Sequence, residues 1–67
     1  MSWVRGIVKS YDPISGKGLV TLAEGGDDVR VDFVGTQGIR LAEGLQVEIK
    51  RIQRPSGVYV SGVRVIA

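Results

Sequence analysis

The 67-residue sequence contains no cysteine and no histidine. Without cysteine the chain can form no disulfide bond, and without both residues the usual zinc clusters are excluded. A nucleophile–base pair of the Ser–His or Cys–His kind is excluded for the same reason. One core in a chain of this size supplies only about 3–5 kcal/mol. Stability must therefore come from a closed, well-registered sheet or from self-association.

Long apolar segments are also absent. The longest apolar run is far too short to span a bilayer, and the N-terminus lacks a basic-then-apolar signal peptide. We therefore expect a single cytoplasmic domain over residues 1–67, without a membrane partner. The net charge of +2 is mild, so it allows a polyanionic partner but does not require one.

Acidic residues gather in one place only, the segment "EGGDD", which contributes Glu24, Asp27 and Asp28. Glycine and aspartate are ordinary turn residues. We interpret the cluster as a solvated hairpin turn rather than a metal or acid–base site. The sequence offers no other catalytic constellation, so neither an enzyme nor a cofactor is expected.

Apolar and polar residues alternate in five short segments, within residues 4–9, 19–22, 29–33, 45–50 and 58–65. Turn signals separate them, namely "DPISG", a Gly-Gly pair and "RPSG". Residues 34–44 hold three glycines and no clear period, so we expect a long connection with room for one helical turn. The alternation changes phase at Arg51-Ile52, which predicts either a β-bulge or a strand that leaves the barrel surface. Ser61-Gly62 offers a second phase change.

Five short strands with glycines at the corners favour a small all-β barrel. Gly6, Gly18 and Gly62 stand where strong coiling or close strand approach would leave no room for a side chain. Closure would also remove exposed sheet edges. We predict a five-stranded antiparallel OB-fold barrel.

Four segments resemble the motifs of the cold-shock domain, in the same order. "GIVKSYD" (residues 6–12) is similar to that family's G-x-V-K-W-F-N, and "KGLVTL" (17–22) to K-G-F-G-F-I. "DVRVDF" (28–33) is similar to D-V-F-V-H-F, and "LAEGLQVEI" (41–49) to L-x-E-G-Q-x-V-x-F. The C-terminal "GVYVSGVRVI" matches the closing strand more loosely. The resemblance covers nearly the whole chain and implies a cold-shock-like OB-fold.

The resemblance also implies a function, the binding of single-stranded RNA or DNA. In that family bases stack on aromatic rings of the first three strands, while lysines hold phosphates. The positions that match the binding motifs, retained or replaced, are Lys9, Tyr11, Lys17, Leu19, Thr21, Arg30, Asp32 and Phe33. Leu19, Thr21 and Arg30 replace phenylalanines, Asp32 replaces the histidine, and Ser10 replaces a tryptophan.

The lost rings weaken the expected binding. Stacking one base on an aromatic side chain contributes about 1–3 kcal/mol, and Asp32 would repel phosphate. Arg30 can compensate in part, because a guanidinium stacks on bases and pairs with phosphate. Together with Arg5, Lys9 and Lys17 it is predicted to form a basic patch on one sheet face. We therefore expect weak, salt-sensitive binding with little sequence readout.

Individual side chains leave alternatives open. Lys9 and Lys17 either grip phosphates or solvate the outer face. Tyr11, at a strand end, is predicted to be exposed, whereas Phe33 continues the inward phase and either stacks or joins the core. Tyr59 alternates outward, where it extends a binding surface or packs against a neighbour.

Two further features are interpreted structurally. Trp3 precedes the matched segment and is expected to cap the barrel or cover an edge. Lys50, Arg51 and Arg54 form the densest basic cluster, which we interpret as a solvated hairpin end.

A second function stays open beside nucleic-acid binding. The loss of aromatic rings, the charge of Asp32 and the outward Leu19 are also compatible with a protein-interaction or self-assembling barrel. Such a barrel would have lost nucleic-acid binding, and a homodimer is its simplest form.

Overall fold

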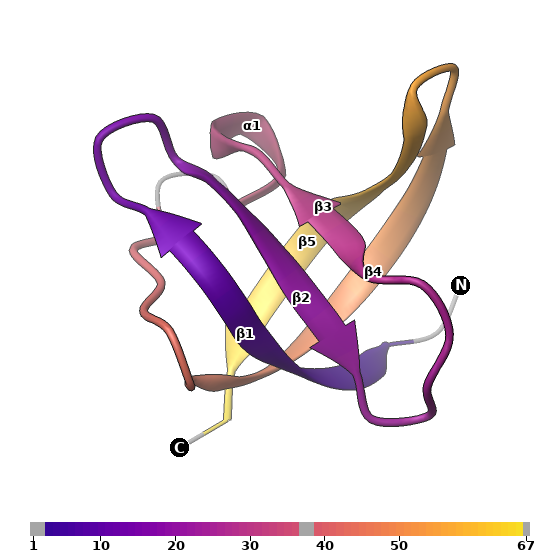
Figure 1. Cartoon of the computed structure of the whole chain (residues 1–67), viewed down its shortest axis with the longest axis horizontal. Coiled ribbons are helices and arrows are strands. Elements are labelled where there is room, and N and C mark those ends of the chain that lie inside the picture. The colour runs from indigo at the N-terminus through magenta and orange to yellow at the C-terminus, as the bar shows by residue number, and fades with distance from the viewer. Residues whose placement is uncertain (1–2, 37–38, 67) are drawn as a thin grey trace.

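A computed structural model describes residues 3–36 and 39–66 of the chain. The elements in chain order are β1 (Val4–Asp12), β2 (Lys17–Leu22), β3 (Val29–Val31), α1 (Phe33–Thr36), β4 (Gln46–Arg54) and β5 (Gly57–Val65). The strands close into a barrel in the order β1-β2-β3-β5-β4, as Figure 1 shows. The predicted five-stranded, OB-like barrel is confirmed, and α1 supplies the single helical turn expected after the third strand.

The sheet is mixed, which corrects the prediction of a wholly antiparallel barrel. Four neighbouring pairs are antiparallel, but β3 and β5 run parallel and share one residue pair, Arg30 opposite Tyr59. Five strands close this barrel. Because an odd number of strands cannot alternate in direction all the way around a ring, one pair has to be parallel. We call this short contact the β3–β5 junction.

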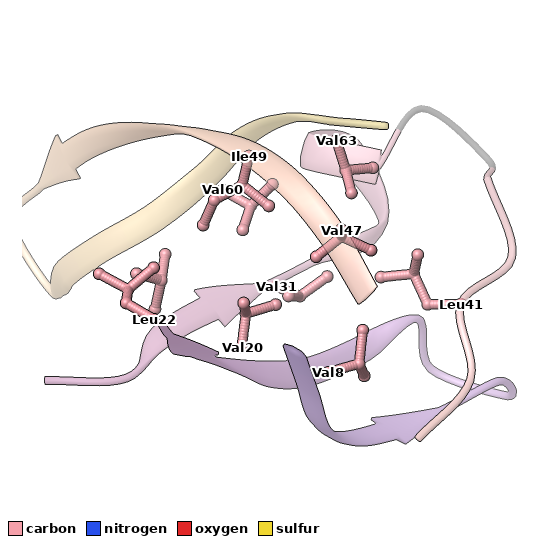
Figure 2. Packing of buried hydrophobic residues seen from close by; sticks show 10 residues of the cluster. Val8, Val20, Leu22, Val31, Leu41, Val47, Ile49, Val60 and Val63 are labelled. Carbon is pink, nitrogen blue, oxygen red and sulfur yellow. The ribbon is translucent and has the colours of Figure 1, made fainter. Parts of the chain in front are cut away.

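The core fills the barrel with branched aliphatic side chains (Figure 2). Its members are Val8, Val20, Leu22, Val29, Val31, Leu41, Val47, Ile49, Val60 and Val63. Most of them occupy alternate positions on their strands, because successive side chains point to opposite faces of a sheet. The outer face is left to the intervening residues.

Two β-bulges change which residues face outward. On β5 the register passes from Lys50 opposite Gly62 to Arg51 opposite Val60, so Ser61 has no partner. The register shift lies next to both positions of the expected phase changes, although the extra residue is on β5 alone.

The second bulge, on β1, lies at Lys9, between the pairs Val8–Val20 and Ser10–Leu19. It was not predicted. An extra residue reverses the alternation beyond it, so Tyr11 turns toward the barrel and packs against the core. The expectation that Tyr11 is exposed was therefore wrong, since this side chain is half-buried.

Asp32 ends the third strand earlier than predicted. Its side-chain Oδ1 accepts a hydrogen bond from the backbone N–H of Gly35 at 2.7 Å. A carboxylate in this position caps the first turn of a helix, and α1 begins at the next residue. Phe33 therefore leaves the alternation, and its side chain is 64% exposed. The core role considered for Phe33 is wrong.

Two of the three glycines that were expected at close approaches do sit at them. A Cβ on Gly6 would lie 2.7 Å from a methyl of Val20, and one on Gly18 would collide with the carbonyl oxygen of Ser10. Gly62 differs, because a Cβ there would meet only the ring of Trp3, at 3.8 Å.

None of the helical segments within residues 3–36 and 39–66 has the length and apolar character needed to cross a bilayer.

Candidate nucleic-acid interface

A row of outward residues crosses three neighbouring strands. Leu19 on β2 lies opposite Arg30 on β3, which lies opposite Tyr59 on β5. These three side chains, with Lys17 and Asp32, line a shallow hollow of about 310 Å³. We call this region the Tyr59 surface; it consists of Lys17, Leu19, Arg30, Asp32, Arg54 and Tyr59.

The ring of Tyr59 is the centre of this surface. The guanidinium carbon of Arg54 lies 4.6 Å from the ring centroid, and that of Arg30 lies 5.9 Å from it. Both distances are within the range of cation–π attraction. Arg54 therefore stacks against the tyrosine, while Arg30 lies farther from the ring.

The turn between β4 and β5 fixes this group in place. Ser56 Oγ donates a hydrogen bond to the Tyr59 hydroxyl oxygen at 2.9 Å, and Arg30 Nη1 donates to the Ser56 carbonyl at 3.1 Å. The hydrogen bond from Ser56, followed by the nearby Arg30, lowers the pKa of Tyr59. Ring and guanidinium groups are thus held in a defined arrangement before any ligand arrives.

Asp32 neutralises one cation of the Tyr59 surface. Its Oδ2 accepts a hydrogen bond from Arg54 Nη1 at 2.6 Å, in an ion pair. The N–H of Gly35 lowers the pKa of Asp32, and Arg54 adds to that effect. The Asp32 carboxylate therefore neutralises the Arg54 guanidinium, which could otherwise bind a phosphate.

Lys9 and Thr21 belong to a separate cluster around Asp28. Lys9 Nζ lies 3.0 Å from Asp28 Oδ2, and Thr21 Oγ1 donates to Oδ1 of the same carboxylate at 3.1 Å. The hydrogen bond from Lys9 lowers the pKa of Asp28. This cluster adds no net charge to the outer face.

The charge that is left on the Tyr59 surface is positive. It carries three cations, Lys17, Arg30 and Arg54, and one carboxylate, Asp32. Within the residues that the structure describes, Lys17 and Arg30 have no ion-pair partner. These two side chains are free to meet an anion.

The structure thus brings together only some of the residues that the sequence selected. Lys17, Leu19, Arg30 and Asp32 share one hollow. Arg5 does not join them, because it lies on the part of β1 that pairs with β4, opposite Glu48. The basic patch expected from Arg5, Lys9, Lys17 and Arg30 is therefore divided into three places.

Phe33 lies at one end of the barrel, beside the β1–β2 loop. A Cβ on Gly16 would lie 3.1 Å from the Cβ of Phe33, so the β1–β2 loop and α1 are adjacent, as Figure 1 also shows. The exposed fractions of Ile14 and Val34, from these two segments, are 96% and 72%. We call Ile14, Phe33 and Val34 the apolar end.

Sequence patterns alone predict no binding role for Arg54 or Ser56. Arg54 was interpreted as part of a solvated hairpin end, and Ser56 as a turn residue. The sequence feature that could have indicated a binding role for these two residues is the turn "RPSG", which stands just before an outward tyrosine. Its meaning depends on the β3–β5 junction, which brings Arg30 to a turn 26 residues further along the chain.

The acidic turn also lines a hollow, of about 450 Å³, between the β2–β3 and β4–β5 turns. Glu24, Asp27 and Arg51 are among its lining residues, and all three are exposed. Among the described residues, no group of three or more acidic side chains is placed to hold a metal ion.

Trp3 covers the outer face of the sheet rather than a barrel end. Its ring lies against Gly62, with the Arg64 guanidinium carbon 4.1 Å and Lys50 Nζ 4.9 Å from the ring centroid. Lys50 and Arg54, grouped together in the sequence, thus attach to two different aromatic rings.

A comparison of the chain with protein-family models and with curated proteins finds no match.

Proposed function

We propose that this chain is a divergent cold-shock-like protein that binds single-stranded RNA or DNA weakly on the Tyr59 surface. The observation that carries the proposal is the tyrosine ring flanked by Arg30 and Arg54, in one hollow with Lys17 and Leu19. The resemblance of the strand motifs to the cold-shock domain supports it.

Binding combines electrostatic capture with limited stacking. Lys17 and Arg30 attract the phosphates, and the Arg54–Tyr59 stack offers a π-face to a base, as aromatic and arginine side chains do in single-strand-binding proteins. The apolar Leu19 contacts the base edge without serving as a stacking plate. No element of the surface distinguishes one base from another, so little sequence preference is expected.

The affinity depends on salt in a predictable way. For single strands, the slope of log K against log salt is about −0.7 for each phosphate contact. Lys17 and Arg30 together therefore predict a slope of about −1.4. Arg54 contributes less, since it is held by Asp32.

Fluorescence anisotropy with labelled single strands at low salt tests the proposal. Arg30→Gln should weaken binding, whereas Arg40→Gln, which removes an exposed cation outside the Tyr59 surface, should leave it nearly unchanged. No binding at tens of micromolar protein, binding indifferent to salt, or equal effects of the two variants would contradict it.

A second candidate function is self-association, favoured by the apolar end. Ile14, Phe33 and Val34 present three exposed apolar side chains on adjacent segments, and an exposed apolar patch can mark a protein–protein contact. A symmetric dimer would bury them against a second copy. Light scattering over a wide concentration range tests this idea: Phe33→Ser should shift a dimer toward monomer, and a strict monomer throughout would exclude it.

A further inference from the structure

A second cationic region with an aromatic ring lies on the outer face of β1, β4 and β5. Arg5 on β1 is opposite Glu48 on β4, which is opposite Arg64 on β5. In the adjacent row, Lys50 is opposite Gly62. We call this region the Trp3 surface; it consists of Trp3, Arg5, Glu48, Lys50, Gly62 and Arg64.

The ring of Trp3 packs over Gly62 on the outer face of β5. The ring atom Cη2 lies 3.8 Å from the place that a Cβ at Gly62 would take. Arg64 and Lys50 lie 4.1 Å and 4.9 Å from the ring centroid. The ring is therefore placed on the sheet with cations beside it, and the Trp3 side chain remains only partly buried.

The charge of this surface resembles that of the Tyr59 surface. Arg64 Nε donates to Glu48 Oε1 at 2.8 Å, in an ion pair. Among the described residues, Arg5 and Lys50 have no ion-pair partner. Each surface thus holds three cations, one carboxylate and one aromatic ring.

The two surfaces are joined along β5. Tyr59 and Arg64 are five residues apart on this strand, which corresponds to about 17 Å at a rise of about 3.3 Å per residue. In a regular strand, residues an odd number of positions apart face opposite sides. The bulge at Ser61 changes the phase between them, so Tyr59 and Arg64 both lie on the outer face.

We propose that a single strand bound at the Tyr59 surface continues along β5 onto the Trp3 surface. There a base lies against Trp3, and phosphates meet Arg5 and Lys50. This inference rests on the proposed function and extends it, since it names the path of the strand. The bulge at Ser61 is what makes that path continuous.

The test uses the fluorescence of Trp3 as the probe, because the chain contains only one tryptophan. OB-fold site sizes run from about 4 to 16 nucleotides, so strands of about 4 and about 16 nucleotides are compared. Titration with the longer strand should change the Trp3 emission with the same midpoint as the anisotropy. If the anisotropy saturates while the Trp3 emission stays constant, binding at the Trp3 surface is ruled out, and the proposed binding at the Tyr59 surface is unaffected.

A charge variant adds a second readout. Arg5→Gln removes a cation other than the two that lie against the Trp3 ring, Lys50 and Arg64, and Arg40→Gln is its matched control. For the longer strand, Arg5→Gln should reduce the salt slope by about 0.7, the value for one phosphate contact. The shorter strand should bind as before.

The outcomes separate this inference from the proposed function. An equal effect of Arg5→Gln on both strand lengths, or an equal effect of Arg40→Gln, would overturn the continuous path. No anisotropy change with either strand would overturn the proposed function, and the path with it.

Discussion

The Tyr59 surface and the Trp3 surface carry the same types of groups on differently built parts of the barrel. Tyr59 lies at the β3–β5 junction, where a single residue pair joins the strands, and Ser56 holds its hydroxyl. Trp3 lies over β4 and β5 beside the bulge at Ser61, against a glycine in a ladder of eight residue pairs. The difference shows two ways to hold an exposed ring: by hydrogen bonds at a junction of one residue pair, or by packing on a long strand pair.

The largest difference between the surfaces should appear in stability, at the glycines beneath them. Gly18→Ala would push a Cβ into the Ser10 carbonyl under the Tyr59 surface. Overpacking of this kind costs about 1–3 kcal/mol or more. Gly62→Ala adds a Cβ in ordinary contact with Trp3, and it should change the free energy of unfolding by less than about 0.5 kcal/mol. Urea unfolding measures both, and equal losses would contradict this view of the two surfaces.

In binding, the tyrosine ring should matter more than any single charge. Tyr59→Ala should lower the affinity for single strands by about 1–3 kcal/mol, the usual contribution of one stacked base. Tyr59→Phe keeps the ring and should bind nearly as well as the wild type. Anisotropy measures the affinities, and circular dichroism shows whether both variants remain folded. If Tyr59→Ala binds unchanged, the ring is not the platform.

Removing the charge of a carboxylate should change the affinity in the opposite direction, by strengthening it. Asp32→Asn keeps an oxygen for the Gly35 N–H but releases the charge of Arg54, so it should strengthen binding. One added phosphate contact would steepen the salt slope by about 0.7.

Glu48→Gln is the matched change on the other surface, where it releases Arg64. We expect it to strengthen the binding of long strands only. Weaker binding by Asp32→Asn would mean that the Arg54–Asp32 pair positions the tyrosine rather than competing with phosphate.

The smallest expected effect is on acid stability. The pKa of Asp32 in the folded protein lies below its ordinary value of 3.8, chiefly because of the Gly35 N–H. The stabilisation is therefore present above that value and is lost as pH falls through the lowered folded pKa.

Urea unfolding from about pH 6 to about pH 2 should show a shallower decline for Asp32→Asn than for the wild type. A decline of equal steepness would show that the Asp32 carboxylate makes no difference. Asp28→Asn gives the comparison for the Lys9 pair.

Much of the fold could be predicted because the barrel interior follows a simple rule. Val20, Val29, Val47 and Ile49 occupy alternate positions and are buried. Turn residues separated the strands, and the phase change in the last two strands indicated the bulge at Ser61.

What could not be predicted depends on events outside the local pattern. The bulge at Lys9 has no distinctive sequence, yet it turns Tyr11 inward. Asp32 looks like an outward strand residue until its side chain caps α1 and exposes Phe33. The meeting of Arg30 with Tyr59 requires the parallel β3–β5 junction, which no spacing along the chain reveals.

The single residue pair at the β3–β5 junction has a consequence for local unfolding. Few backbone hydrogen bonds hold β3 to β5, so amides there should exchange with solvent through openings that need less free energy than global unfolding. Arg30 and Tyr59 are the pair that closes the junction and also the centre of the Tyr59 surface.

A strand that bridges Arg30 and Tyr59 should therefore protect these amides as its concentration rises, by about 2.7 kcal/mol at 100 times the dissociation constant. Binding on the outer face would then be measurable as slower hydrogen exchange of the backbone amides beneath it.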